Sequence, residues 1–453
     1  MQNLMTKNMI ASKKIVIVGL GKTGLSCVRY LGHSEKDITV MDDRQTPPGI
    51  EELNASYPDV KCVLGKFDRA ILCSADEIIL SPGVSLMNDD IQSAIASGVR
   101  VRGDIDIFSE KANAPIVAIT GSNGKSTVTT LLGEMARQAG WDTGVGGNIG
   151  IPALDLLEES KQLYILELSS FQLETTENLG AHSVVILNIS EDHMDRYPVK
   201  IDYLKAKQRI FRESKNIIIN DDDAQSSPAV SSLKNRIHFG LGPQEKDKFS
   251  VMEREGGQRY LTKGFEPLLN IEELKIKGEH NLSNALAAMA LASSVGISTQ
   301  AVLSALRAFK GLEHRCQYVR TVRGVEFIDD SKATNPGSAA TAISSIGIGC
   351  SGKVILIAGG ESKGADLSPL KAVMKTYGKA AYLIGRDASL FESTFNGCIT
   401  TSKKNSLKDA IISAFELSVS GDVVLMSPAC ASFDMFSNFE HRGRVFSDVV
   451  HGL

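Results

Sequence analysis

Residues 115–127 read Pro-Ile-Val-Ala-Ile-Thr-Gly-Ser-Asn-Gly-Lys-Ser-Thr, a β-branched run that enters a glycine loop and then a segment with helical spacing. In such a strand, loop and helix, backbone N–H groups and the helix N-terminus can bind a polyphosphate. Lys125 can reach the terminal phosphates, and the hydroxyl of Ser126 or Thr127 can bind Mg²⁺. The strict G-x-x-x-x-G-K-S/T pattern is not met, because Ile119 stands at its first glycine. A plain strand-to-helix turn is therefore the alternative.

Strand and helix patterns continue on both sides of this loop. Apolar runs predict strands at 14–19, 38–41, 77–80, 99–101, 164–168 and 184–188, with helices at 25–31 and 127–139. A polar stretch at 242–263 precedes helices at 281–294 and 299–308, and strand patterns follow at 325–328, 353–358, 381–384 and 422–426. A chain of 453 residues suits about three domains. We predict an α/β protein with a Rossmann-like domain at 1–103, a central P-loop ATPase-type domain with a mostly parallel sheet at 104–312, and a C-terminal Rossmann-like domain at 313–453.

Composition excludes several classes of protein. The net charge is −4, whereas a nucleic-acid binder normally carries a basic excess that neutralises phosphates. The seven cysteines are scattered and form no C-x-x-C pair, so neither a disulfide framework nor a zinc site is indicated. No apolar run reaches the roughly 20 residues that cross a bilayer. We expect a cytoplasmic protein that does not bind nucleic acid and does not insert into a membrane. We also expect a monomer.

Two charged residues stand out by their positions, Glu167 as a candidate metal ligand and Lys207 as a lysine on the buried face of a helix. Glu167 ends a predicted strand, and in parallel sheets ligands bind beyond the carboxyl ends of strands. Its carboxylate suits Mg²⁺, which prefers oxygen ligands. Lys207 falls on an apolar helical stripe formed by Tyr203, Leu204, Ile210 and Phe211. A buried lysine is costly unless it is paired or modified, although a lysine that extends to solvent is the alternative.

A second glycine pattern, Gly19-x-Gly21-x-x-Gly24, follows the first predicted strand, and Asp42 ends the next one. This arrangement is typical of a dinucleotide site and by itself favours NAD, although the pattern alone is weak. Arg44 would supply a cation for an anionic diphosphate. The alternative is that Asp42 and Arg44 form only a surface ion pair.

The chain resembles the Mur ligase family over essentially its whole length. Its phosphate loop is similar to the variant loop of Mur ligases and folylpolyglutamate synthetases. Further segments are similar to family blocks in the same order: Glu167-Leu-Ser-Ser-Phe-Gln-Leu-Glu174, Asn188-Ile-Ser-Glu-Asp-His-Met-Asp195, Lys277-Gly-Glu-His-Asn-Leu-Ser-Asn284, Gly311-Leu-Glu-His-Arg315, Asp329-Asp-Ser-Lys-Ala-Thr-Asn-Pro336 and Ser427-Pro-Ala-Cys-Ala-Ser-Phe-Asp434. The short first domain and the pair Phe171-Gln172 resemble the members that add D-glutamate.

The resemblance implies an ATP site that spans two domains. It assigns ATP binding to Gly121, Ser122, Asn123, Gly124, Lys125, Ser126, Thr127, Asn281, Asn284, Arg315 and Asp330. Helix capping is the alternative role for Asn281 and Asn284. The resemblance also assigns catalysis to Lys125, His193, Lys207 and Lys332. It assigns the binding of two Mg²⁺ ions to Ser126, Glu167, His193 and Lys207. It further implies that Lys207 is carbamylated, so that its new carboxylate binds the second Mg²⁺.

The resemblance also implies two further substrate sites. UDP-N-acetylmuramoyl-L-alanine would be bound by Lys22, Thr23, Asp42, Asp43, Arg44, Gly83, Asn148 and His193. D-glutamate would be bound by Thr334, Lys363, Ser432 and Phe439. A solvated loop lysine is the alternative for Lys363. The loop departs from the family pattern, since it reads Glu-Ser-Lys-Gly, and Phe433 follows Ser432 where a smaller aliphatic residue is expected.

The activity implied is ATP-dependent joining of D-glutamate to the nucleotide sugar through an acyl phosphate, in the cytoplasmic stage of peptidoglycan synthesis. Because the ATP candidates lie in two domains, we expect a hinge near 310–314 and domain closure before chemistry. Three alternatives remain from the residues themselves: a ligase for another substrate, an NAD(P)-dependent oxidoreductase that uses the first glycine turn, and a nucleotide-binding switch without chemistry.

Overall fold

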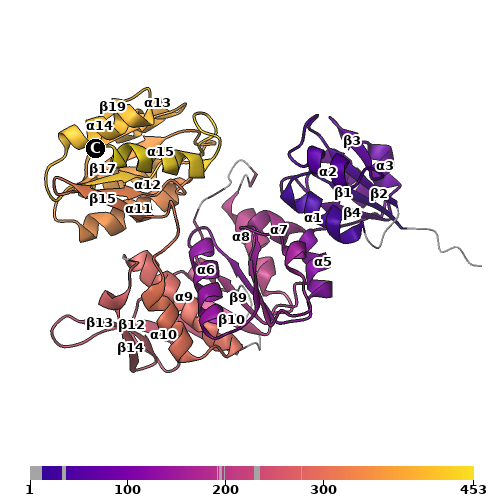
Figure 1. Ribbon diagram of the computed structural model, residues 1–453, viewed down its shortest axis with the longest axis horizontal. Coiled ribbons are helices and arrows are strands. Elements are labelled where there is room, and N and C mark those ends of the chain that lie inside the picture. Colours follow the sequence, from indigo (N-terminus) through magenta and orange to yellow (C-terminus); the bar gives the residue numbers. More distant parts are fainter. Residues whose placement is uncertain are drawn as a thin grey trace, which may run out of the picture.

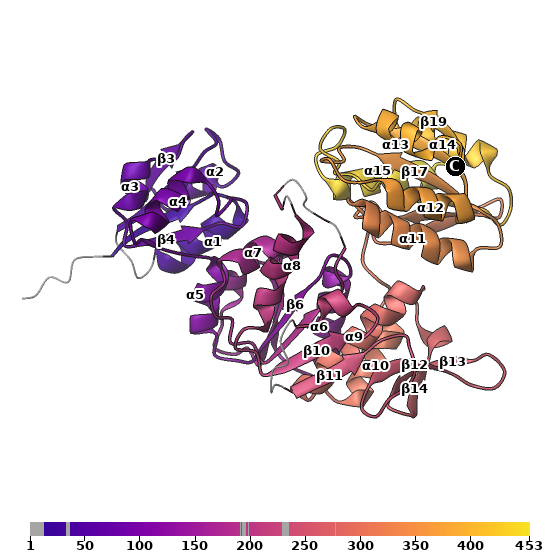
Figure 2. The same cartoon turned by 180° about the vertical axis from the view of Figure 1, so that it is seen from behind.

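The computed structural model describes residues 13–32, 37–190, 192, 196–197, 199–228, 235–276 and 278–453. These residues form three lobes, each built on its own sheet (Figure 1). Views from both sides place the first and third lobes on the same side of the central one (Figure 2). The predicted α/β fold with mostly parallel sheets is confirmed. Among the helices of the described residues, none is long and apolar enough to cross a membrane.

The first lobe has a parallel sheet in the order β3-β2-β1-β4-β5. Strand β1 lies at its centre, where its apolar residues are buried on both faces, so the glycine turn after it opens at the carboxyl edge of the sheet. The elements are β1 Lys14–Val18, α1 Lys22–Leu31, β2 Asp37–Asp42, α2 Ile50–Ser56, β3 Lys61–Leu64, α3 Arg69–Cys73, β4 Glu77–Leu80, α4 Asp89–Ala96 and β5 Arg100–Arg102. Helix α5 (Asp104–Lys111) connects this lobe to the central one.

The central lobe has nine strands in the order β14-β13-β12-β11-β10-β9-β6-β8-β7. Strands β6 to β12 pair in parallel, and β12, β13 and β14 form an antiparallel extension. The strands are β6 Ile116–Thr120, β7 Thr143–Gly147, β8 Leu163–Glu167, β9 Ser183–Ile186, β10 Asn216–Asn220, β11 Asn235–Phe239, β12 Phe249–Glu253, β13 Arg259–Lys263 and β14 Glu266–Asn270.

Helices cover both faces of this sheet and bury its apolar strands. Helix α6 packs beside α9 and α10 on one face, in a single core with β6 and β8. The helices are α6 Lys125–Gln138, α7 Ser170–Thr175, α8 Lys200–Gln208, α9 Glu279–Val295 and α10 Thr299–Ala308. Short 3-10 turns are η1 Ala153–Leu156, η2 Arg209–Phe211, η3 Ala224–Ser226 and η4 Ile271–Glu273.

The third lobe has a sheet in the order β15-β16-β20-β17-β18-β19, parallel except for the β15-β16 pair. Buried strands β17 and β20 form its centre. The elements are β15 Gln317–Val322, β16 Val325–Asp329, α11 Pro336–Gly349, β17 Val354–Gly359, α12 Ser368–Tyr377, β18 Gly378–Ile384, α13 Ala388–Phe395, β19 Thr400–Lys403, α14 Leu407–Leu417, β20 Val423–Met426 and α15 Phe439–His451.

Candidate active site

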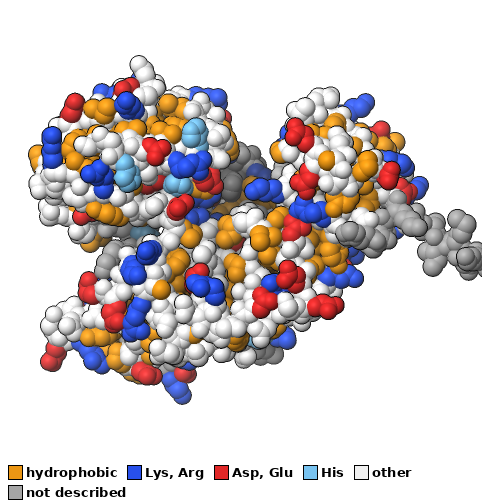
Figure 3. All heavy atoms as spheres, in the orientation of Figure 1, with side chains coloured by type: hydrophobic (Ala, Val, Ile, Leu, Met, Phe, Trp, Pro, Cys, Tyr) orange, Lys and Arg blue, Asp and Glu red, His pale blue; other side chains and the backbone are white. Residues whose placement is uncertain are grey.

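A cavity of about 1450 Å³ lies between the central and third lobes. It opens at the carboxyl ends of the central strands, where open α/β sheets bind their ligands. Candidates from both lobes line it together: Asn123, Gly124, Thr127, Asn281, Asn284, Arg315, Asp330 and Lys332. The structure therefore brings together predicted ATP-site residues that are more than 200 positions apart in the sequence. Figure 3 shows the hollow that separates the first lobe from the third.

The phosphate loop follows β6. Its conformation is fixed by two glycines with positive φ and by hydrogen bonds to a residue just beyond the neighbouring strand β9. Gly121 and Gly124 have φ values of 153° and 82°, a region that favours glycine. Asn188, just beyond β9, accepts hydrogen bonds from the backbone N–H groups of Ser122 and Asn123, both at 2.9 Å. Lys125 Nζ donates to the carbonyl oxygens of Gly121 and Ser122, at 2.9 and 3.0 Å. Burial lowers the pKa of Lys125.

Oxygen ligands that suit Mg²⁺ meet beside the loop. Ser126 Oγ donates to Glu167 Oε2 at 2.6 Å, and Asn148 Nδ2 donates to Glu167 Oε1 at 2.7 Å. Arg315 Nη2 donates to Ser126 Oγ at 2.6 Å, which links the third lobe to this cluster. Among the described residues no three His, Cys, Asp or Glu side chains gather to hold a metal. The Ser126 hydroxyl and the Glu167 carboxylate are hard oxygen donors of the kind that Mg²⁺ takes together with substrate phosphates.

Lys207 is buried, with 1% of its surface exposed, so its side chain does not extend to solvent. Its Nζ donates to Gly121 O at 3.0 Å and to Thr120 Oγ1 at 3.2 Å, and it lies 4.7 Å from the Tyr203 ring centroid. Burial, and then the charge of Lys125, hold the pKa of Lys207 well below its usual value. His193, the fourth predicted catalytic residue, lies outside the described residues.

The third lobe contributes an acid and a lysine from the segment after β16. Asp330 accepts hydrogen bonds from Ser427 Oγ at 2.7 Å and Cys316 N at 3.1 Å, and burial raises its pKa to about 7. Lys332 Nζ lies 3.9 Å from the Phe439 ring centroid. Burial, and then the charge of Arg315, lower the pKa of Lys332 to about 8.

The predicted adenine pair lies on the first turns of α9. Asn284 Nδ2 donates to Asn281 Oδ1 at 3.4 Å, and both side chains line the cavity. Gly278 occupies the N-cap position of this helix, so neither asparagine is its N-cap. A Cβ at Gly124 would lie 2.3 Å from Asn284 Oδ1, which places this amide directly against the phosphate loop.

The D-glutamate candidates lie on neighbouring loops of the third lobe. The Lys363 and Ser432 loops are joined by two backbone hydrogen bonds between Glu361 and Ala431, at 3.0 and 3.1 Å. Lys363 is exposed, with φ of 51°, and Ser432 is buried. Phe433 leaves 69% of its surface exposed. The other two candidates lie close to Lys332. Thr334 is exposed and follows Lys332 by two residues, and the Phe439 ring contacts the lysine Nζ.

The nucleotide-sugar candidates surround the first glycine turn. Asp42 is buried, accepts from Leu20 N at 2.7 Å, and binds the Arg44 guanidinium through both oxygens at 2.7 and 2.8 Å. The pair is thus part of the turn and is not a surface contact between two exposed groups. The other candidates lie around the same turn. Lys22, Asp43 and Gly83 are exposed, and Thr23 is half-buried.

Two buried residues that the sequence did not indicate support the third-lobe site. His314 Nδ1 bonds Asp329 Oδ2 at 2.7 Å, and its carbonyl accepts from Lys332 N at 3.0 Å. Arg442 Nη2 donates to the carbonyl oxygens of Ser331 and Cys430, at 2.8 and 3.1 Å. The block Gly311-Leu-Glu-His-Arg315 could have indicated His314, whereas nothing local in α15 distinguishes Arg442 from its neighbours.

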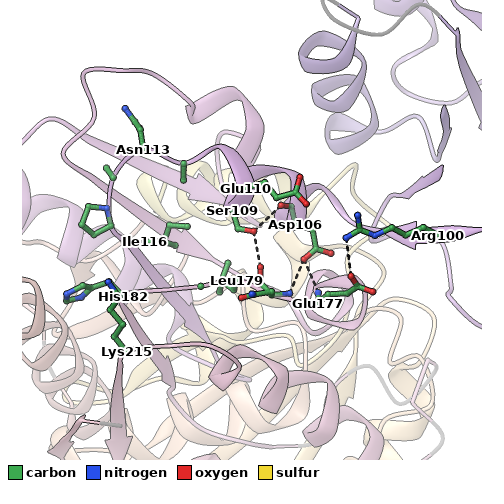
Figure 4. Close-up of a pocket in the computed structure, with 15 residues that line it drawn as sticks. Arg100, Asp106, Ser109, Glu110, Asn113, Ile116, Glu177, Leu179, His182 and Lys215 are labelled. Carbon is green, nitrogen blue, oxygen red and sulfur yellow. Dashed lines mark hydrogen bonds and ion pairs between the residues drawn. The ribbon is translucent and has the colours of Figure 1, made fainter. Parts of the chain in front are cut away.

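A second cavity of about 550 Å³ lies at the opposite end of the central sheet (Figure 4). Ile116, His182 and Lys215 line it where β6, β9 and β10 begin. Arg100 of the first lobe donates to Glu177 at 3.1 Å beside it. Because this cavity lies at the amino ends of the strands, it is separate from the phosphate loop and from the candidate residues.

Three family models match the chain. They describe the N-terminal domain of MurD-like Mur ligases at 13–103, the Mur ligase middle domain at 119–292, and the Mur ligase glutamate ligase domain at 314–430. The UDP-N-acetylmuramoylalanine–D-glutamate ligase of Marinobacter nauticus is 50% identical over 98% of this chain and 99% of its own. The ligase of the same name from Pseudomonas aeruginosa is 49% identical over 97% and 98%.

Solved structures agree on the fold. The match to MurF of Acinetobacter baumannii has a TM-score of 0.61 at 17% identity, over 97% of this chain and 92% of that one. The UDP-N-acetylmuramate–alanine ligase MurC of Thermotoga maritima gives a TM-score of 0.60 at 17% identity, over 97% and 99%. With these matches along its whole length, the chain belongs to the Mur ligase family.

Proposed function

We propose that the chain is an ATP-dependent ligase that joins D-glutamate to UDP-N-acetylmuramoyl-L-alanine in peptidoglycan synthesis. The observation that carries this proposal is the Ser126, Glu167 and Arg315 cluster, which joins the phosphate loop to the third lobe. The names and near-complete coverage of the relatives support the choice of substrates. The seven free cysteines support a reducing compartment such as the cytoplasm.

In this proposal each domain has one substrate. Residues 1–103 bind the UDP part at the glycine turn, 104–312 bind ATP, and 313–453 bind D-glutamate. Asn148, a candidate for the nucleotide sugar, is hydrogen-bonded to Glu167 beside the phosphate loop, which supports adjacent sites for the two substrates. The proposal includes action as a monomer.

The reaction has two steps. A carboxylate oxygen of the nucleotide sugar attacks the γ-phosphorus of ATP, so that an acyl phosphate forms and ADP leaves. The amine of D-glutamate then attacks the acyl carbon, the tetrahedral intermediate collapses, and inorganic phosphate leaves with the C–O bond electrons. Lys125 and Lys332 neutralise phosphate charge, and Arg315 fixes the Ser126 hydroxyl. Catalysis is then mainly positioning and charge stabilisation.

Mg²⁺ bound at Ser126 and Glu167 would offset the charge of the phosphate oxygens. We propose a second ion at Lys207 after its Nζ has reacted with CO₂ to form a carbamate. The reaction requires a neutral amine, and the burial and lowered pKa of Lys207 support one. Protein incubated with ¹³C-bicarbonate should show a carbamate carbon resonance that is absent from Lys207→Met, and equal spectra would reject the modification.

The test of the activity is phosphate release from ATP in the presence of UDP-N-acetylmuramoyl-L-alanine. D-glutamate would be compared with L-glutamate, meso-diaminopimelate and L-lysine, with Lys125→Met as the inactive control. We expect release with D-glutamate alone. Release with another amino acid would keep the ligase chemistry and reject the specificity. Absence of release with all four amino acids would reject the ligase proposal and favour the alternative of a nucleotide-binding switch without chemistry.

A further inference from the structure

Arg196, between β9 and α8, bridges the first and central lobes through one guanidinium. Its Nη1 donates to Pro82 O at 2.8 Å, and its Nη2 donates to Val84 O at 3.3 Å. Nη2 also donates to Glu174 Oε2 of α7 at 2.6 Å. The side chains of Arg196 and Glu174 are only 15% and 17% exposed. The guanidinium carbon lies 4.2 Å from the Phe171 ring centroid, which fixes its plane as well as its charge.

The two carbonyls that Arg196 holds flank Gly83, a candidate for contact with the nucleotide sugar. The same loop is anchored to the glycine turn, because Ser81 Oγ donates to Gly19 O at 2.8 Å and Ser81 N donates to Val18 O at 2.9 Å. A Cβ at Gly83 would have no atom within 4 Å. The backbone of residue 83 is therefore open to a ligand while the loop is held on both sides of it.

The segment that carries Arg196 also braces the phosphate loop. Ser190 N donates to Ser122 Oγ at 2.9 Å, and Asn188 accepts from Ser122 N and Asn123 N. Described residues 188–190 and 196 thus contact the ATP loop at one end and the first-lobe loop at the other. Both contacts belong to the connection between β9 and α8.

We propose that Arg196 is a positioning residue that sets the 81–84 loop, and with it the nucleotide-sugar substrate, relative to the phosphate loop. The proposal rests on the proposed function. A reacting carboxylate must approach the γ-phosphorus within about 3.5 Å, and a misplacement of about 1 Å can cost about 100-fold in rate. Arg196 makes no contact with the phosphate loop itself, so its effect is on the distance between the two ligands.

Other arginines join the two lobes at more exposed places. Arg29 pairs with Asp155, with side chains 34% and 23% exposed, and Arg100 pairs with Glu177, with side chains 49% and 59% exposed. Exposed pairs of this kind contribute little. The hydrogen bonds of these two pairs go to Asp155 and Glu177, not to the 81–84 loop. Arg29→Met is therefore a matched control, since it removes a bridge between the same lobes away from the substrate loop.

The experiment measures steady-state kinetics of D-glutamate-dependent phosphate release for wild type, Arg196→Met, Arg196→Lys and Arg29→Met. We expect Arg196→Met to lower kcat about 10- to 100-fold, with KM for ATP within about twofold of wild type. Arg196→Lys should recover part of the loss, because an ammonium can donate to some of the three acceptors but does not stack in one plane. Arg29→Met should keep kcat. Rates are expressed per folded molecule, so loss of folded protein alone leaves kcat unchanged.

A second measurement does not depend on activity. Hydrogen exchange of peptides that cover residues 77–90 should be faster in Arg196→Met than in wild type or Arg29→Met. The inference is overturned if Arg196→Met and Arg29→Met have equal kcat and equal exchange. If wild type shows no D-glutamate-dependent release, the proposed function fails, and the exchange of residues 77–90 alone decides whether Arg196 positions the loop.

Discussion

Arg442→Met should separate activity from stability. The Arg442 side chain is 1% exposed, and its Nε donates to Ser331 Oγ at 3.0 Å while Nη2 donates to Ser331 O and Cys430 O. Ser331 lies between Asp330 and Lys332, so the guanidinium fixes the segment that carries both site residues. Methionine keeps much of the apolar stem volume and removes the three donors.

The expected change in the free energy of unfolding is small, because two effects oppose each other. Loss of Arg442 leaves two buried carbonyls without that partner, at about 1–3 kcal/mol each. Burial lowers the pKa of Arg442 from its usual 12.5 to about 10. A shift of that size means that burial disfavours the charged guanidinium by roughly 3 kcal/mol. Methionine has no charge, so this cost is absent from the variant. The net change should therefore lie between a stabilisation of about 1 kcal/mol and a destabilisation of about 3 kcal/mol.

Activity should fall much further, since a displacement of Lys332 by about 1 Å can lower kcat about 100-fold. The assay is phosphate release at saturating substrates, alongside urea unfolding of the same samples. Arg444→Met is the control, because Arg444 is an exposed arginine on the same helix. A kcat per folded molecule within threefold of wild type would refute the positioning role of Arg442, whatever its stability.

Asp42→Asn removes the charge that braces the first glycine turn, so KM for the nucleotide sugar should rise about tenfold in initial-rate kinetics while KM for ATP stays constant. Gly124→Ala, at φ of 82° and with its Cβ 2.3 Å from Asn284 Oδ1, should abolish ATP binding by calorimetry. Gly140→Ala, at φ of 80° in open space, should keep ATP binding and show that strain alone is not the cause. ATP should raise the pKa of Lys332 from about 8, so binding at pH 8 takes up about half a proton and binding at pH 6 takes up almost none. Calorimetry in buffers of different ionisation enthalpy measures this uptake, and an equal uptake at both pH values would contradict the assignment.

Local patterns predicted many elements well. The helix at 299–308 coincides with α10, whose N-cap Ser298 accepts a hydrogen bond from Ala301 N through its side-chain oxygen, and the strand at 77–80 coincides with β4. The polar stretch at 242–263 carried no strand prediction, although β12 and β13 both lie within it. These strands form an antiparallel hairpin with a partly exposed face, so they lack the continuous apolar run of the buried parallel strands.

The candidate site was predictable where a motif is continuous in sequence, and less so where it depends on tertiary contacts. The phosphate loop, Glu167 and Lys207 follow from spacing, and the structure places them together. Arg442 acts on a segment 111 residues away, and Arg196 reaches a loop 112 to 114 residues away. Neither contact leaves a local signal, because an arginine on a polar helix or loop is ordinarily a solvated group.

The charges of the site connect ATP binding to the arrangement of the lobes. In a chain of net charge −4, burial lowers the pKa of Lys125, Lys207, Arg315 and Lys332 at one place. Neighbouring cations lower the pKa further for Lys207 and Lys332, and the Glu167 carboxylate offsets part of this repulsion. A polyphosphate offsets that repulsion and meets donors already in place, which is the arrangement that stabilises phosphoryl transfer. Arg315 and Lys332 belong to the third lobe, whereas Lys125 and Lys207 belong to the central one. Lys332 is repelled across the lobes by Lys125 and attracted by Glu167, and the negative charge of ATP adds to that attraction. We therefore expect nucleotide binding to favour the state in which the third lobe lies against the phosphate loop, with a hinge near 310–314.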